Sequence, residues 1–203
     1  MRRPVAAVAL LSLASLAVAC TQLKRCAYEG WGRDEWQQPE RVVGALGLEP
    51  GARVADLGSG GGYFTFRLAR AVGPTGRVYA ADVDEDLNAY VRERAEEEGL
   101  TNVETVLAEY ADPKLPEAVD LVFTCDTYHH LEDRTPYFAG LKRYLRPKGR
   151  VAIIEFAEAP SWYLPDHATS GETIRSEMEA AGYRLVQAHD FLARQHFLVF
   201  AVD

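Results

Sequence analysis

The chain has 203 residues, which suits one domain large enough to bury its own hydrophobic core. Hydrophobic residues make up 48% and charged residues 26%, the composition of an ordinary globular protein rather than a disordered one. The formal net charge of -8 argues against nucleic acid as the partner, because phosphate backbones are bound by broad basic surfaces. A local basic patch is still compatible with that charge, and we expect a small molecule as the substrate.

Residues 1–20 have the features of a targeting segment. Met1, Arg2 and Arg3 give a positive start, and the apolar run 5–19 has the length of a signal-peptide core and is short for a membrane span. The run ends Leu-Ala-Val-Ala before Cys20, which resembles a bacterial lipoprotein signal in which Cys20 becomes lipidated. We therefore expect a signal segment at 1–20, a single domain at 21–203 and anchoring in the bacterial envelope. An uncleaved anchor or a buried helix is the alternative, and if the segment is not used the protein is cytoplasmic.

The three cysteines, Cys20, Cys26 and Cys125, form no C-x-x-C pair, so we expect neither a zinc site nor a redox motif. Cys125 ends an apolar run and is expected to be a buried structural thiol.

After a polar lead-in at 21–34, strands and helices alternate along the chain. Helices are predicted at 39–46, 63–71, 85–98, 136–145 and 172–181, and strands at 53–57, 77–81, 103–107, 119–125, 150–156, 184–188 and 196–202. Such alternation predicts a doubly wound α/β fold, a mostly parallel sheet with helices on both faces. The last two of the seven strands are separated by a short connection, which predicts antiparallel pairing at one edge.

A glycine-rich loop joins the first strand to the next helix. It runs from Asp56 through Gly58, Ser59, Gly60 and Gly62. Glycines there allow a ligand to approach the backbone closely, and the helix behind them offers free N–H groups. A dinucleotide fingerprint needs a sixth-position glycine, but Tyr63 or Thr65 stands there, which argues against NAD. The D-x-G-x-G-x-G pattern resembles motif I of class I, Rossmann-like S-adenosylmethionine (SAM)-dependent methyltransferases.

Two further acidic positions extend this resemblance. Asp82 ends the second strand, 20 residues after Gly62, where a carboxylate can bind both ribose hydroxyls. In the family this position binds ribose, and Val83 lies against the adenine. The family also places an adenine-contacting acid after the third strand, for which Glu109 and Asp112 are both candidates.

The end of the fourth strand carries the candidate chemistry. Asp126, Tyr128, His129 and His130 follow an apolar strand, and many small-molecule methyltransferases have a similar His-His-Leu turn. Methyl transfer needs a base only when the acceptor loses a proton, and histidine has the pKa range for that task. Either histidine is a base, or it caps the helix or binds backbone. A metal site is not expected, because no further ligands are evident.

These patterns predict a SAM-dependent methyltransferase acting on a small-molecule acceptor, with Asp126 also near the cofactor. Trp36 either lines the acceptor site or packs a helix on the sheet. The loop 160–170, with Trp162, Tyr163 and His167, is a candidate substrate lid. The alternatives are a lipid-anchored protein that keeps the SAM-binding fold without catalysis and, less favoured, an NAD-dependent oxidoreductase.

Overall fold

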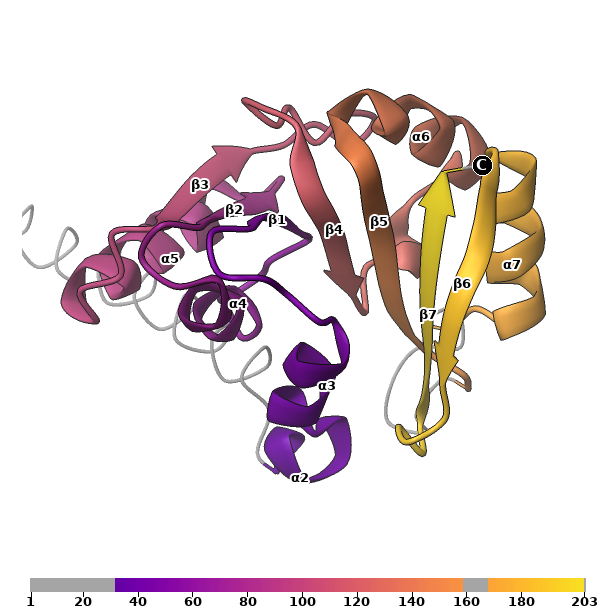
Figure 1. The fold of residues 1–203 in the computed structure, drawn as a ribbon, viewed down its shortest axis with the longest axis horizontal. Coiled ribbons are helices and arrows are strands. Elements are labelled where there is room, and N and C mark those ends of the chain that lie inside the picture. Colours follow the sequence, from indigo (N-terminus) through magenta and orange to yellow (C-terminus); the bar gives the residue numbers. More distant parts are fainter. Residues whose placement is uncertain (1–31, 159–167, 203) are drawn as a thin grey trace, which may run out of the picture.

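The computed structural model describes residues 32–158 and 168–202. Within them seven strands form one sheet in the order β3-β2-β1-β4-β5-β7-β6 (Figure 1). The strands are β1 (Arg53–Leu57), β2 (Arg77–Asp82), β3 (Val103–Leu107), β4 (Val119–Cys125), β5 (Leu145–Phe156), β6 (Tyr183–His189) and β7 (Gln195–Val202). Strands β1 to β5 pair in parallel, whereas β7 runs antiparallel to both β5 and β6. The predicted fold class is therefore confirmed, with the antiparallel pairing at one edge.

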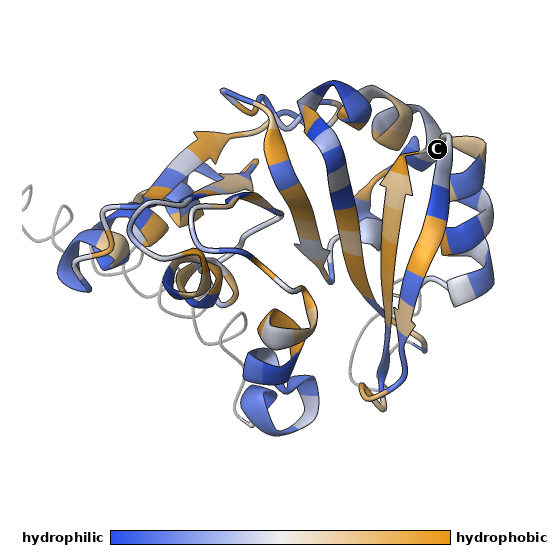
Figure 2. Ribbon diagram, in the orientation of Figure 1, coloured by the Kyte–Doolittle hydropathy of each residue, from blue (hydrophilic) through white to orange (hydrophobic). Residues whose placement is uncertain are grey.

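Helices pack against both faces of this sheet. They are α2 (Arg33–Gln37), α3 (Pro39–Ala45), α4 (Thr65–Val72), α5 (Glu85–Glu97), α6 (Arg134–Leu141) and α7 (Gly171–Ala180), with 3-10 turns η1 (Tyr128–His130) and η2 (Lys142–Tyr144). Leu68 of α4 shares a buried cluster with Leu121 and Phe123 of β4. Val122, between them, belongs to a second cluster with Met178 of α7. Both faces of β4 are thus covered, which explains its largely apolar sequence (Figure 2), in which Asp120 and Thr124 are the polar residues.

The segment before β5 differs from the sequence prediction. A helix was expected over 136–145 and a strand from 150, but α6 ends at Leu141 and β5 already begins at Leu145. Pro147 and Gly149, residues that usually interrupt regular structure, lie inside β5. The pairing with β4 is irregular at this point and accommodates them. Val119 pairs with Leu145 and Leu121 pairs with Arg150, so two residues along β4 correspond to five along β5. The left-handed backbone of Lys148, with φ 68°, allows this excursion.

The N-terminal part of the described chain adds one helix that the sequence did not predict. Residues 33 and 34 were assigned to a polar lead-in, and they begin the short helix α2. Residues 1–20 with Cys20, and the lid candidates Trp162, Tyr163 and His167, lie outside the described residues. Across 32–158 and 168–202, the helices are too short or too polar to cross a membrane.

Candidate functional site

The glycine loop follows β1 and packs against the loop that follows β4. Gly58, Gly60 and Gly62 have φ values of 70°, 54° and 81°, a region that favours glycine. A Cβ atom on Gly58 would lie 2.2 Å from Oγ1 of Thr127, so any side chain at this position would collide with Thr127. Glycine is therefore required at position 58 for two reasons, its backbone conformation and the contact between the two loops.

Asp56 lies beneath this loop and is almost fully buried. Its Oδ2 accepts a 2.6 Å hydrogen bond from Oγ1 of Thr65. Burial, opposed by the Thr65 hydrogen bond and assisted by nearby Asp82, raises the pKa of Asp56 to about 7. A positively charged ligand would favour the ionised carboxylate, because an opposite charge stabilises that form. The site therefore favours a cation beside Asp56.

Asp82, at the end of β2, connects that strand to the glycine loop. Its Oδ2 accepts a 2.8 Å hydrogen bond from the backbone N–H of Gly60, and its Oδ1 accepts one of 3.0 Å from the backbone N–H of Asp84. A carboxylate has about four acceptor positions, so roughly two remain for a ligand such as a ribose diol. The neighbouring side chain of Val83 is 41% exposed, which is uncommon for valine and leaves an apolar surface beside Asp82.

The two candidate acids after β3 have different partners. Asp112 accepts hydrogen bonds from the Tyr144 hydroxyl at 2.8 Å and from Arg143 at 2.6 Å. These contacts hold its carboxylate against η2, away from a ligand. Glu109 is exposed and forms an ion pair of 3.1 Å with Lys114. Of the two residues, Glu109 is the one whose carboxylate a ligand can reach by displacing a surface ion pair.

Asp126, directly after β4, is held in a buried polar network. Its φ of 55° is rare for aspartate, and such backbone strain is often found at functional sites. Gln195 donates a 2.6 Å hydrogen bond to Oδ1, Gln37 donates one of 3.4 Å to Oδ2, and Arg33 lies 3.7 Å from Oδ2. Burial raises the pKa of Asp126 to about 6, while Arg33 opposes the shift. Helix α2 thus places a cation over the ends of β1 and β4.

His129, in η1, forms a pair with Glu155 near the end of β5. Its Nδ1 lies 3.0 Å from both carboxylate oxygens, and its backbone N–H donates a 3.1 Å bond to Oε2. Glu155 is completely buried, and the His129 side chain is 5% exposed. The His130 ring packs at 4.0 Å against that of His129 and is exposed. Since Glu155 accepts from Nδ1, this geometry favours the tautomer in which Nε2 is the proton acceptor.

Tyr128 was a candidate catalytic residue, but its side chain points into the core. It is fully buried, its ring stacks on Phe138, and its hydroxyl donates a 2.6 Å bond to Glu177. Burial and this bond raise its pKa well above the usual range. Arg134 completes the contact by binding both oxygens of Glu177. Tyr128 therefore joins η1, α6 and α7, and we exclude it from the proposed chemistry.

Several residues in this region were not identified from the sequence. Glu155 lies in a predicted strand and was not predicted as a site residue. An acid within the apolar run 151–156 is nevertheless a recognisable sign of a buried, paired carboxylate. Gln37 and Gln195 are buried and also bond each other at 3.0 Å, but nothing local marks them as partners of Asp126. Trp36 packs against the Phe156 ring at 5.7 Å, which supports the packing alternative for its role.

The residues around the loop fit the implied cofactor, a cationic nucleoside. An acid lies at or next to the carboxyl end of β1, β2 and β4, and the apolar Val83 lies beside the ribose candidate. The hydroxyl of Ser59 is buried in the loop with no hydrogen-bond partner among the described residues, so a ligand can supply one. Within those same residues no cluster of His, Cys, Asp and Glu has the arrangement of a metal site.

Comparison with known proteins identifies relatives along most of the domain. A family model for a methyltransferase domain matches residues 48–190. An arsenite methyltransferase from Halobacterium salinarum is 29% identical over 153 residues, covering 69% of this chain and 39% of the relative. A ubiquinone/menaquinone biosynthesis C-methyltransferase from Ectopseudomonas mendocina is 32% identical over 117 residues, covering 55% of this chain and 44% of the relative. The chain thus spans less than half the length of these curated relatives.

Solved structures agree with the fold. A SAM-dependent methyltransferase from Aquifex aeolicus superposes with a TM-score of 0.81 at 28% identity, covering 90% of this chain and 98% of that one. A magnesium protoporphyrin IX methyltransferase from Synechocystis, solved with bound SAM, has a TM-score of 0.63 at 20% identity, covering 83% and 80% of the two chains. The second likeness concerns the fold alone.

Proposed function

The chain belongs to the methyltransferase-domain family, and we propose that it transfers the methyl group of SAM to a small-molecule acceptor. The observation that carries this proposal is the link between the glycine loop and Asp82 inside the matched segment. Gly60 binds Asp82, and Gly58 contacts Thr127 after β4, so three strand ends are joined around one ligand position. In open α/β sheets ligands bind at this edge, outside the carboxyl ends of the strands.

In this proposal the two ends of SAM lie on different strands. Asp82 accepts the ribose hydroxyls, and Val83 covers one side of the adenine, with Glu109 as the candidate at its rim. The glycine loop with Asp56 and Ser59 lies along the amino-acid end, where a positive charge would offset the burial of Asp56. Arg33, 3.7 Å from Asp126, provides the cation for a ligand carboxylate at the same end.

When bound, SAM supplies an electrophilic methyl group attached to a good leaving group. The residues of the chain then have to align the acceptor, exclude water and take up any released proton. His129 is our candidate proton acceptor at Nε2, and Glu155 orients the ring and stabilises the charge that develops on it. His130, exposed beside it, is the second candidate. A thiolate or carbanion acceptor has no proton to lose and needs neither histidine.

The test is calorimetric titration of the purified protein with SAM, with its demethylated product and with NAD. We expect binding of the first two and none of NAD at the same concentration, because Tyr63 or Thr65 stands where a dinucleotide loop needs glycine. Preferential binding of NAD would overturn the proposal. Methyl transfer in a screen of small acceptors separates an enzyme from a lipid-anchored binding protein that keeps the fold without catalysis.

We also propose that the protein is exported and anchored in the bacterial envelope through lipidated Cys20. The support is the sequence of residues 1–20, with its positive start, apolar run and Ala-Val-Ala-Cys ending. An envelope location requires that SAM, which is made in the cytoplasm, reach the protein there. If the segment is not used, the protein acts in the cytoplasm.

A further inference from the structure

A cavity lies on the side of the sheet opposite the glycine loop, at the amino ends of β5 and β6. It has a volume of about 790 Å³ and is formed where β5 and β6 begin and β7 ends. Arg150 lines it and precedes Glu155 by five residues on the same strand, which corresponds to about 16 Å of extended chain. None of its lining residues belongs to the candidate functional site, so it needs a separate explanation.

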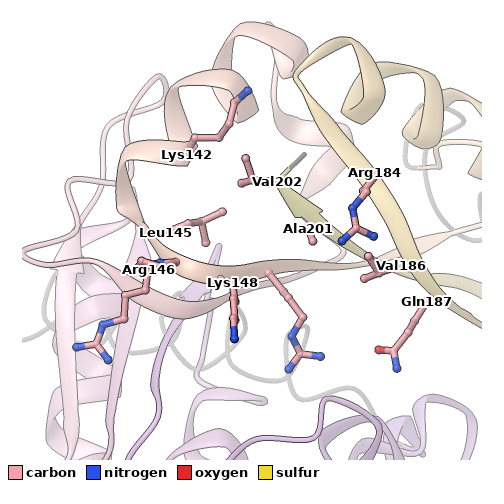
Figure 3. A pocket seen from close by; sticks show the side chains of 12 residues that line it. Lys142, Leu145, Arg146, Lys148, Arg184, Val186, Gln187, Ala201 and Val202 are labelled. Atoms are coloured by element: carbon pink, nitrogen blue, oxygen red, sulfur yellow. The ribbon is translucent and has the colours of Figure 1, made fainter.

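The cavity is strongly basic. Its positive side chains are Lys142, Arg146, Lys148, Arg150 and Arg184, and the residues described as lining it include no aspartate or glutamate. Figure 3 shows that these cations come from three segments, with Lys142 in η2, Arg146 and Lys148 at the start of β5, and Arg184 in β6. The start of β5 is accordingly hydrophilic in Figure 2. In a chain of net charge -8, such a concentration of positive charge is a local exception.

Among the described residues, Arg146 has an acidic partner, whereas the contacts of Arg150 and Lys142 are with neutral groups. Arg146 forms an ion pair with Asp120 at 3.2 Å. Arg150 donates a 2.7 Å hydrogen bond to the carbonyl of Leu46, which holds the side chain in place without cancelling its charge. Lys142 lies 5.6 Å from the Tyr183 ring centroid, another contact that keeps the cation positive. Arg150 and Lys142 thus keep their positive charge at the cavity, because their partners in the described part of the chain are neutral.

The irregular start of β5 builds one wall of the cavity. Residues 146–149 lie opposite Asp120 alone, because the pairing with β4 passes from Val119–Leu145 to Leu121–Arg150. A Cβ on Gly149 would lie 2.9 Å from the Arg146 carbonyl oxygen, so this excursion is tight as well as left-handed at Lys148. Arg146 and Lys148 therefore extend from a constrained segment, which lowers the conformational entropy that the chain loses when these two side chains bind an anion.

We propose that this cavity binds a phosphate-bearing anion, either a free phosphorylated small molecule or the headgroup of an anionic lipid. Guanidinium and ammonium groups together recognise phosphate by charge-assisted hydrogen bonds. The volume lies within the range of small-ligand sites, about 300 to 1,000 Å³. A long nucleic acid is disfavoured, because the chain as a whole carries a net charge of -8.

The experiment uses pyrophosphate as the probe, titrated calorimetrically into the purified protein at low ionic strength. We expect binding that weakens as sodium chloride is added, and a loss of affinity of about tenfold or more in Lys148→Glu/Arg184→Glu. Arg175→Glu, a charge reversal at an exposed position on α7, is the matched control and should change the affinity little. Lys148→Gln, at an exposed position, is the milder variant should the double variant fold poorly.

Vesicles distinguish the two sources of phosphate. Co-sedimentation with phosphatidylglycerol vesicles beyond that with phosphatidylcholine vesicles, lost in Lys148→Glu/Arg184→Glu, identifies a lipid headgroup, whereas pyrophosphate binding without it identifies a free phosphorylated molecule. Absence of both, or equal pyrophosphate affinity in wild type and double variant, overturns the proposal. SAM affinity should be unchanged in the double variant, so the outcome is independent of the proposed methyl transfer.

Discussion

The Nδ1 atom of His129 lies 3.0 Å from both carboxylate oxygens of Glu155, although the two residues are 26 positions apart in the sequence. Glu155 also accepts the backbone N–H groups of His129 and Phe156. Its buried charge is thus satisfied by three donors, and the imidazole orientation is set by the same group. This contact favours the tautomer of His129 with the proton on Nδ1, a preference that the position of His129 in the sequence does not indicate.

This pair leads to a prediction for catalysis. If the acceptor loses a proton during methyl transfer, His129→Ala should lower the single-turnover rate about a hundredfold and leave SAM affinity nearly unchanged, because a base acts in the transition state. Glu155→Gln should lower the rate less, and it should alter the pH dependence of that rate, since the imidazole loses its charged partner. His130→Ala tests the second candidate base in the same assay. Unchanged rates in both histidine variants would remove base catalysis from the mechanism.

Cofactor binding should depend on Asp82. Asp82→Ala is expected to weaken SAM binding by roughly 3 kcal/mol, because it removes charge-assisted bonds to the ribose and also releases Gly60. Asp82→Asn keeps the size of the side chain and one acceptor oxygen, so its SAM affinity should lie between those of the wild type and Asp82→Ala. Calorimetric titration measures these affinities, with Asp86→Asn, four residues on and exposed, as the control. Equal SAM affinity in wild type and Asp82→Ala would rule out the ribose assignment.

The stability of the protein should decrease as the pH rises from about 4 to 7. The pKa of Asp56 is raised from 3.8 to about 7 in the fold, so over this interval the folded state holds a proton that the unfolded state has released. Ionising the buried group then costs roughly 4 kcal/mol by pH 7. Asp126, with a pKa of about 6, contributes in the same direction.

Urea denaturation at a series of pH values measures this effect. Asp56→Asn should flatten the decline of the unfolding free energy with pH, since the variant has no carboxyl group to ionise. Parallel curves for wild type and Asp56→Asn would show that Asp56 is ionised in the fold at pH 5. SAM, if it places a cation beside Asp56, should bind more tightly above pH 7 in wild type and lose that dependence in the variant.

Export and lipidation at Cys20 can be tested directly on native protein. Mass spectrometry should find a diacylglycerol-modified Cys20 as the first residue, recovered in the membrane fraction. Cys20→Ser should abolish the modification, whereas Cys26→Ser, six residues on, should not. Recovery of intact Met1 in a cytoplasmic fraction would contradict both lipidation and export.

The sequence by itself determined the order and type of most elements and the position of the glycine loop. Both depend on local information: β4 is largely apolar because its two faces are covered, and Gly58 must be glycine because of its φ of 70°. Asp82 was placed at the end of β2 for the same reason, since hydrophobic patterning shows where a short buried strand stops. The family resemblance of the D-x-G-x-G-x-G loop also depends on adjacent residues.

The tertiary structure decided which side chains meet. Asp126 is held by Gln195 and Gln37, 69 and 89 positions away, and no local pattern records such a pairing. Tyr128 and His129 are neighbours in η1, yet one points into the core toward Glu177 and the other binds Glu155. Asp112 and Glu109 also have different partners, since Asp112 binds η2 and Glu109 forms a surface ion pair with Lys114. Side-chain direction depends on backbone rotation and on distant partners, so the roles within the site could be assigned only after the chain had folded.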